Sequence, residues 1–303
     1  MAADDQEPSH HAPTDAVGAD RPLTVRLRGG AGNQLFQWAA ARSLAGPESI
    51  RAIRSTTDDQ LAIELLLPGV LQFTESPPTT LWDRLLARRG RLTRITGLFR
   101  PLGRRHLYSQ RGRLPWAYEP RPRWFVRPEL LDGYFQHPSW LQPGGSDVVE
   151  ELLGHAPSGL ESLRALPPYA AICTRRGDYE SLGLTLPQDY YDHAVALLPS
   201  SLPLVLVGDD PAYLASLAIR LRAIGREVVQ PPPVADDPAV NDFWLTVAAS
   251  SVVMANSTFC WWATTTGDHA CDDTTRRTVI FPARWLGGHG TELCAPAWVS
   301  VPS

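Results

Sequence analysis

The amino-acid sequence predicts an α/β fold built on parallel sheets. Short apolar runs of strand length recur along the chain, and segments with helical spacing follow them. The first strand, at residues 23–27, alternates apolar and polar residues and passes through a glycine-rich turn straight into a helical segment, as nucleotide-binding units do. A later run, at residues 169–174, ends abruptly in charged residues, as expected of a strand whose carboxyl end faces a ligand.

Length and composition predict two domains. The chain has 303 residues, of which 44% are hydrophobic and 20% are charged, which is a globular composition. Residues 1–20 are rich in Ala, Asp, His and Pro and lack periodicity, so we expect a disordered tail there. Proline and glycine interrupt the chain near residues 157–168, as a linker would. We therefore expect a first domain over residues 21–160 and a second over residues 161–303.

Charge and residue usage argue against several classes of protein. The net charge of −4 offers no basic field for nucleic acid. All 28 basic residues are arginine, which argues against P-loop nucleotide hydrolases, pyridoxal phosphate enzymes and protein kinases, because each needs a lysine at a fixed position. Four scattered cysteines without a C-x-x-C pattern argue against a zinc site or a disulfide framework.

The sequence predicts a cytoplasmic location. It contains neither a secretory signal nor an apolar run of about 18 residues, the length of a membrane span. Residues 84–105 are rich in arginine and overlap an expected helix at residues 81–92. We interpret them mainly as a solvated face. The alternative is a surface that attracts an anionic acceptor or makes peripheral contact with the inner face of a membrane.

The first domain opens with a strand, a glycine-rich turn and a helix. The strand covers residues 23–27, the turn has the sequence GGAGNQ at residues 29–34, and the helix is expected over residues 35–44. The glycines let the backbone approach a ligand, and amides at a helix start attract an anion. The alternative is a tight turn that only helps the helix to pack, with Asn33 and Gln34 as caps.

This opening differs from a dinucleotide-binding fingerprint. The glycine spacing is not G-x-G-x-x-G, and the next strand, at residues 49–53, has no acid at its end to bind a ribose. It ends near Arg54 instead, which leaves NADP binding as a minor alternative.

Aromatic residues mark the last strand of the first domain, expected at residues 130–136. Tyr134, Phe135 and Trp140 could stack on the face of a sugar, although core packing is the better interpretation for two of the three. A helix that begins near residues 147–153 would lead to the second domain.

The second domain is organised around the end of the strand at residues 169–174. Arg175 and Arg176 follow this strand directly, and a glycine and Asp178 come next. Each guanidinium group presents a fork of donors that matches phosphate oxygens, so the pair suits a doubly negative ligand such as a diphosphate. The alternative is a strand end closed by a salt bridge between arginine and aspartate.

Two further strand ends carry polar side chains. The strand at residues 204–207 leads to Asp210, which either binds a hydroxyl group of the ligand or caps the next helix. The strand at residues 251–255 leads to Asn256, Ser257 and Thr258, which form a second phosphate-binding tip or an ordinary helix cap. The other elements expected here are helices at residues 186–198 and 241–249 and strands at residues 227–230 and 279–282.

Four of these segments resemble motifs of one family, in the family's order and spacing. RRGDY at residues 175–179 resembles the HxRRGDY signature of the α-1,2-fucosyltransferases, glycosyltransferase family 11. The segments at residues 29–38, 133–141 and 255–262 are similar to the family's GGLGNQMFQYA, GYFQS and ANSTFSWWGA segments. A shorter match places Asp242 on an acid of the family's DLYLMS segment.

The resemblance implies a GT-B-like architecture, with two Rossmann-like domains that face each other across a cleft. It implies GDP-fucose as the donor substrate, a galactose-ended glycan as the usual acceptor, and inversion at the fucose carbon without a metal or other cofactor. Arginines and helix-start amides would then stabilise the diphosphate as it leaves. Inversion requires a single displacement, so a general base should take the acceptor's proton.

The same resemblance implies roles for individual residues. Arg176 and Asp178 would be catalytic, Asp178 as a candidate for the base. The donor would be bound by Arg175, Arg176, Asp210, Asn256, Ser257 and Thr258. The loop on the acceptor side would comprise Gly29, Gly30, Gly32, Asn33 and Gln34.

One departure from the family pattern bears on the donor. The family's signature begins with histidine, and Cys173 occupies that position here. A thiol cannot replace the donor–acceptor pair of an imidazole. Two alternatives therefore remain open: a transferase that uses a different GDP-sugar, and a non-catalytic protein that binds GDP or glycans.

Overall fold

The structure is a computed structural model that describes residues 22–54, 62–74, 107–109, 121, 127–271, 277–285 and 291–303. The tail expected at residues 1–20 and the helix expected at residues 81–92 lie outside the described residues. The arginine-rich stretch at residues 84–105 does so as well.

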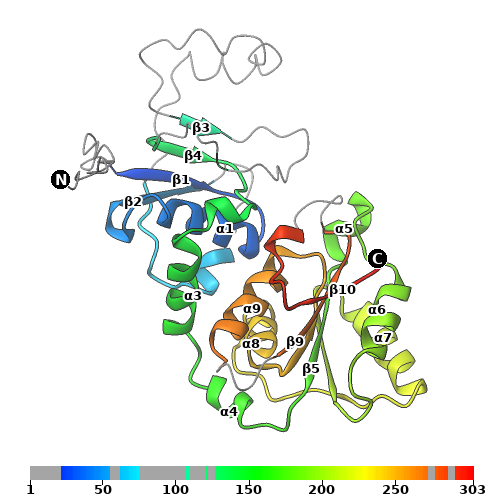
Figure 1. The fold of residues 1–303 in the computed structure, drawn as a ribbon. Coiled ribbons are helices and arrows are strands. Elements are labelled where there is room, and N and C mark those ends of the chain that lie inside the picture. The colour runs from blue at the N-terminus through cyan, green and yellow to red at the C-terminus, as the bar shows by residue number, and fades with distance from the viewer. Residues whose placement is uncertain are drawn as a thin grey trace, which may run out of the picture.

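Two separate parallel sheets form the framework of the protein (Figure 1). All pairings between their described strands are parallel, which confirms the predicted α/β class. The first sheet has the order β2-β1-β4-β3, with β1 at Leu23–Leu27, β2 at Ile50–Arg54, β3 at Leu107–Ser109 and β4 at Leu130–Asp132.

The second sheet has the strand order β10-β9-β8-β5-β6-β7. The direction of winding reverses between β5 and β8, and ligands of such open sheets bind beyond the carboxyl ends of the strands at this reversal. Its strands are β5 (Ala170–Thr174), β6 (Leu204–Gly208), β7 (Val228–Val229), β8 (Ser251–Val253), β9 (Thr278–Pro282) and β10 (Val299–Val301).

Helices cover both faces of the second sheet, with α6 and α7 on one side and α8 and α9 on the other (Figure 1). The chain passes from the first sheet to the second through α3 and α4, and residue 160, the predicted end of the first domain, is the first residue of α4. The described α-helices are α1 (Ala31–Arg42), α3 (Gly144–Gly154), α4 (Leu160–Arg164), α5 (Gly177–Leu182), α6 (Gln188–Ala196), α7 (Pro211–Ala223), α8 (Pro238–Ala248) and α9 (Thr258–His269).

Helices α1 and α8 and strand β4 differ from their predicted bounds. Helix α1 begins at Ala31 rather than at residue 35, so most of the expected glycine turn is its first turn. Helix α8 begins at Pro238 rather than at residue 241, because Asp237 accepts hydrogen bonds from the first free amides and proline suits the first helical position. Strand β4 ends at Asp132 rather than at residue 136, and shortly after it Phe135 has a positive φ of 54°.

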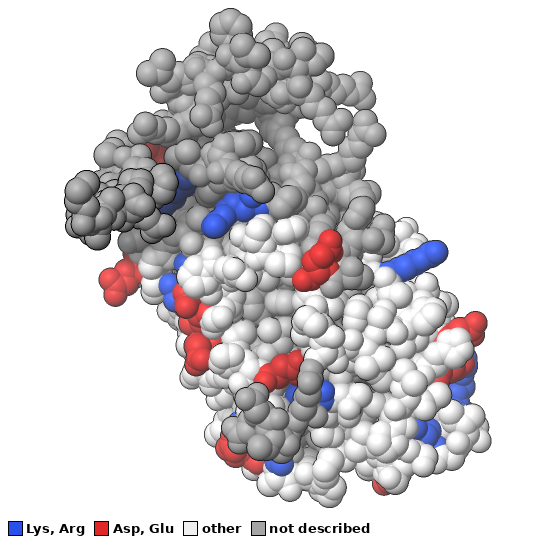
Figure 2. Space-filling model, in the orientation of Figure 1, with Lys and Arg blue, Asp and Glu red and all other residues white. Residues whose placement is uncertain are grey.

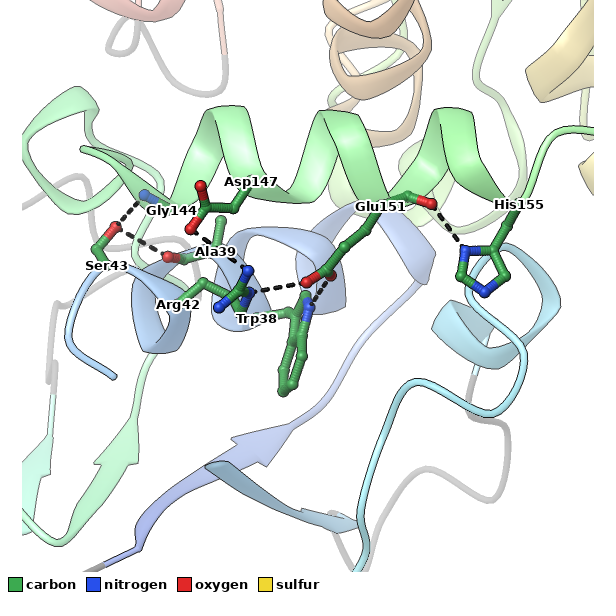
Figure 3. Close-up of polar contacts among 8 residues, drawn as sticks. All are labelled: Trp38, Ala39, Arg42, Ser43, Gly144, Asp147, Glu151 and His155. Carbon is green, nitrogen blue, oxygen red and sulfur yellow. Dashed lines mark hydrogen bonds and ion pairs between the residues drawn. The ribbon is translucent and has the colours of Figure 1, made fainter. Parts of the chain in front are cut away.

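Helix α3 holds α1 in place through a network of polar contacts (Figure 3). The Glu151 carboxylate accepts hydrogen bonds from Trp38 Nε1 at 2.7 Å and from Arg42 Nε at 2.8 Å. At the other end of the contact, Ser43 Oγ accepts from the Gly144 amide at 3.0 Å. A Cβ atom on Gly144 would lie 2.2 Å from Ala39 O, so the two helices touch at the backbone. The direction of α1 is therefore fixed by a neighbouring helix.

Helix α1 also makes a contact between the two halves of the protein, the first half being the part built on the sheet β2-β1-β4-β3 and the second the part built on the sheet β10-β9-β8-β5-β6-β7. Phe36 packs on Trp261 and Trp262 of α9, with ring centroids 5.0 Å and 5.3 Å apart. Asn33 Oδ1 accepts hydrogen bonds from Gln136 Nε2 of its own half at 2.8 Å and from Thr258 Oγ1 of the other half at 3.0 Å. These contacts bring the first turns of α1 and α9 together.

The described surface is mixed in charge. On the face shown in Figure 2, arginines and acids lie in small separate groups over the described residues rather than in one broad basic area. Within the described ranges, no helix combines the length and apolar character needed to cross a bilayer.

Candidate active site

A cavity of about 460 Å³ lies where the two halves meet. Its volume is in the range typical of small-molecule sites. The first half contributes the start of α1, with Ala62, Tyr134 and Gln136. The second half contributes the carboxyl ends of β5 and β6 and the starts of α8 and α9, which is where its strand order predicts a ligand. Two parallel α/β units that share one cavity form the GT-B-like arrangement.

Two helix N-termini converge on this cavity. Gly30 precedes α1 and Ser257 precedes α9, and neither residue makes a side-chain capping hydrogen bond. Neither helix has an acidic residue in its first turn. Amides at a helix start carry partial positive charge and lack partners within the helix, so both starts favour an anionic group in the cavity.

A glycine in α1 makes the close approach of the two helix starts possible. A Cβ atom on Gly32 would lie 2.2 Å from the backbone nitrogen of Phe259 and 2.4 Å from the carbonyl carbon of Thr258. Gly29, with φ of 72°, lies in the left-handed region that favours glycine. The predicted acceptor-side loop is therefore also in contact with α9.

The adjacent arginines have different surroundings. Arg175 lines the cavity, with Nη2 2.7 Å from Asp178 Oδ1 and Nη1 2.8 Å from Asp209 Oδ2. The Arg176 guanidinium lies 2.6 Å from Glu180 and stacks over the ring of Tyr213, and its residue is not part of the cavity lining. The alternative predicted for this motif, a salt bridge from arginine to Asp178, is present as well.

The two aspartates that follow β6 have separate roles. Asp209 lines the cavity and accepts a hydrogen bond from the Arg176 amide at 2.8 Å. Asp210 lies outside the lining and accepts from the amides of Ala212 and Tyr213, both at 3.0 Å, so it caps α7. Of the two predicted roles for Asp210, the structure shows the helix cap. Sequence reasoning did not single out Asp209.

The other predicted donor-binding residues divide between the cavity and its support. Ser257 and Thr258 line the cavity. Asn256 does not; its Nδ2 donates to Leu184 O at 2.8 Å, and its own carbonyl accepts from Tyr179 Oη at 3.2 Å. Asn256 therefore supports the end of β8.

The predicted acceptor-side loop also divides in this way. Gly29, Gly30, Gly32 and Asn33 line the cavity. Gln34 is fully buried behind the loop, where its Nε2 donates to Gly29 O at 2.6 Å and its Oε1 accepts from Ile63 N at 3.0 Å. Gln34 thus braces the loop from behind.

Comparisons with known proteins provide structural likenesses only. No protein-family model and no curated protein matches the chain. A mutant of FUT1 from Arabidopsis thaliana in complex with GDP is similar with a TM-score of 0.46 and 14% identity, over 82% of this chain and 68% of that one. The fucosyltransferase NodZ from Bradyrhizobium is similar with a TM-score of 0.42 and 13% identity, over 80% and 91% of the respective chains. POFUT1 in complex with GDP is similar with a TM-score of 0.39 and 12% identity, over 87% of this chain and 98% of that one.

Among the described residues, no group of three or more His, Cys, Asp or Glu side chains could hold a metal ion. The alternative of NADP binding depended on Arg54. This residue is outside the cavity lining, and its Nη2 lies 3.9 Å from Glu64 Oε2.

Asp242 is a half-buried carboxyl group in the cavity wall to which sequence reasoning gave no role. Its Oδ2 accepts a hydrogen bond from the Gly208 amide at 2.9 Å. Burial raises its pKa to about 6, against the opposing effect of that hydrogen bond. A signal was available, because Asp242 is the one charged residue within the sequence of α8.

Cys173, at the position of the family's histidine, lies beside this carboxyl group. Its Sγ is 3.7 Å from Thr246 Oγ1, and both residues line the cavity. A hydrogen bond with Cys260 and then burial raise the pKa of Cys173 well above its usual value. Cys173 therefore stays a neutral thiol and leaves Asp242 without a cationic neighbour at this position.

Asp242→Asn should abolish a pH dependence of stability. The native pKa of about 6 exceeds the reference value of 3.8, so as pH rises from about 4 to 6 the unfolded chain releases this proton first. The wild-type protein should therefore lose about 3 kcal/mol of stability over this range relative to the variant, with no further change above it. Denaturant unfolding of both proteins at pH 4, 5, 6 and 7 measures the difference, and parallel curves would refute the burial of a charged group here.

Proposed function

We propose that the protein is an inverting glycosyltransferase that moves L-fucose from GDP-fucose to a galactose-type hydroxyl of a glycan, as α-1,2-fucosyltransferases do. The observation that carries this proposal is the convergence of two uncapped helix starts, one from each half, with Arg175 on one cavity. The motif resemblance supplies the identity of the donor and of the acceptor.

In this proposal the diphosphate of the donor lies between the helix starts. Amides of α1 and α9, the hydroxyl groups of Ser257 and Thr258 and the Arg175 guanidinium surround it. These groups stabilise the negative charge that develops on the leaving GDP, so no metal ion is required for this task. Asp209 lines the cavity where Asp210 does not, and its two oxygens hold the Arg176 amide and the Arg175 guanidinium. Arg176 can contact the diphosphate only after its guanidinium group breaks the ion pair with Glu180.

The acceptor lies on the side of the first half. Tyr134 lines the cavity, and the Arg28 guanidinium lies 5.0 Å from its ring centroid, held in turn by Asp132 at 3.0 Å. Phe135 and Trp140 are fully buried, with ring centroids 4.9 Å apart, so they serve the core. We assign the stacking surface for the acceptor sugar to Tyr134.

Asp178 is the general base of the proposed reaction. It lines the cavity at the start of α5, and 58% of its side chain is exposed. In the single displacement, the acceptor oxygen bonds to C1 of fucose while the bond from C1 to the phosphate oxygen breaks. The electron pair leaves with GDP, and the acceptor's proton passes to the Asp178 carboxylate.

The proposal predicts GDP release from GDP-fucose that depends on an acceptor. The test incubates the protein with lactose and, in separate reactions, GDP-fucose, GDP-mannose or UDP-galactose, and measures the nucleotide released. GDP-fucose should be consumed fastest, and EDTA should leave that rate unchanged. A faster reaction with GDP-mannose would favour the alternative donor that Cys173 left open. GDP binding without turnover on a broad panel of acceptors would favour a non-catalytic protein.

A further inference from the structure

The charges of the cavity wall are unbalanced. Among the described lining residues, Arg175 is the only arginine, whereas three carboxyl groups, those of Asp178, Asp209 and Asp242, belong to the same lining. Two of these already form ion pairs with the Arg175 guanidinium, Asp178 with Nη2 and Asp209 with Nη1. A diphosphate that approaches Arg175 would therefore meet two carboxylates already bound there, and like charges so close repel each other.

The two carboxylates are not equally fixed. Asp209 has a second anchor, the Arg176 amide at 2.8 Å, and only 26% of its side chain is exposed. It also packs on Gly177, where an added Cβ would lie 2.6 Å from Asp209 Oδ2. The Asp178 carboxylate has Arg175 as its partner and is far more exposed. Asp178 is thus the partner that Arg175 can release at lower cost.

We propose that the donor diphosphate displaces Asp178 from Arg175, while Asp209 keeps the guanidinium in place. This inference rests on the proposed function, because it concerns the same diphosphate. The exchange frees the Asp178 carboxylate only when the donor is bound. Asp178 is then available to take the acceptor's proton in the step written above. After GDP leaves, Asp178 loses that proton to solvent and pairs with Arg175 again.

The exchange makes an unusual prediction for Asp178→Asn. This variant removes the group that competes with the diphosphate, so GDP should bind more tightly. The expected gain in affinity is about fivefold, because GDP no longer has to break one partly exposed ion pair. Turnover should nevertheless be lost, because asparagine cannot accept the proton. Isothermal titration with GDP and the GDP-release assay measure the two effects, and an unchanged melting temperature shows that the fold is intact.

Asp209→Asn and Asp242→Asn are the matched controls, because each also removes one carboxylate from the cavity wall. Asp209→Asn should weaken GDP binding, since Arg175 loses its fixed support. Asp242→Asn should not reproduce the fivefold gain at pH 7.5. If all three variants bind GDP equally more tightly, the effect is general charge repulsion and the exchange is refuted. Weaker GDP binding or retained turnover in Asp178→Asn also refutes it.

The GDP titrations and the GDP-release assay together separate this inference from the proposed function. A wild-type protein that does not bind GDP at all contradicts the proposed function. A wild-type protein that binds and turns over GDP-fucose, but whose Asp178→Asn variant shows no gain in GDP affinity, contradicts only the exchange.

Discussion

Arg175→Ala should slow GDP release from GDP-fucose by about 10²-fold while the protein stays folded. Arg175 is the described arginine that lines the cavity, and it lies where the diphosphate charge would develop. Loss of one preorganised donor to such a charge costs about two to three orders of magnitude in turnover. The GDP-release assay at saturating acceptor gives the rate, and a thermal melt shows whether the fold survives.

Arg176→Ala is the matched control for this prediction. It removes the same charge from the next residue, but its guanidinium bonds Glu180 and stacks on Tyr213 outside the cavity lining. We expect the rate to fall by less than about tenfold, because the variant loses only one exposed ion pair and one ring contact, and such contacts contribute little. Equal losses in the two variants would show that both arginines reach the donor, as the sequence motif predicts.

Gly32→Ala should destabilise the protein and abolish GDP binding. The new methyl group would lie 2.2 Å from the Phe259 nitrogen and 2.6 Å from Thr258 Oγ1. Backbone atoms cannot rotate away as a side chain can, so α1 and α9 must separate. Overpacking of this kind costs about 3 kcal/mol, and it would also pull apart the two helix starts that form the anion site. Thermal unfolding and titration with GDP measure the two losses.

Gly30→Ala provides the control at the same loop. No atom lies within 4 Å of a Cβ built on Gly30, so this variant should keep its stability. Unchanged stability in Gly32→Ala would mean that the two helix starts do not meet as described. A loss in Gly30→Ala as large as in Gly32→Ala would point to the loop conformation rather than to the helix contact.

Local sequence features predicted the framework of the fold well. Strand β1 has the predicted bounds, and β5 and β9 begin within one residue of theirs, because short apolar runs between turn residues are buried in parallel sheets. Helix α7 begins at Pro211, as the proline and the preceding aspartate indicate. Strand β10 carried no such signal, since Val299 and Ser300 are exposed and only Val301 is buried.

Element boundaries near the site were harder to predict. The glycines before and within the start of α1 suggested a turn, since glycine disfavours helix. Gly32 is nevertheless helical, and its lack of a side chain lets α9 approach it closely. The strand expected at residues 130–136 stops early, while Phe135, with its positive φ, joins the buried core beside Trp140. In both places a contact distant in sequence overrode local preference.

The sequence alone determined the chemical inventory of this protein: parallel α/β units, a pair of arginines, two polar helix starts and no lysine. Only the tertiary structure decided which members of adjacent pairs face the cavity, Arg175 rather than Arg176 and Asp209 rather than Asp210. The physical reason is that neighbouring residues at a strand end point in different directions. The direction of each side chain is then selected by partners from other elements, which no local pattern reveals.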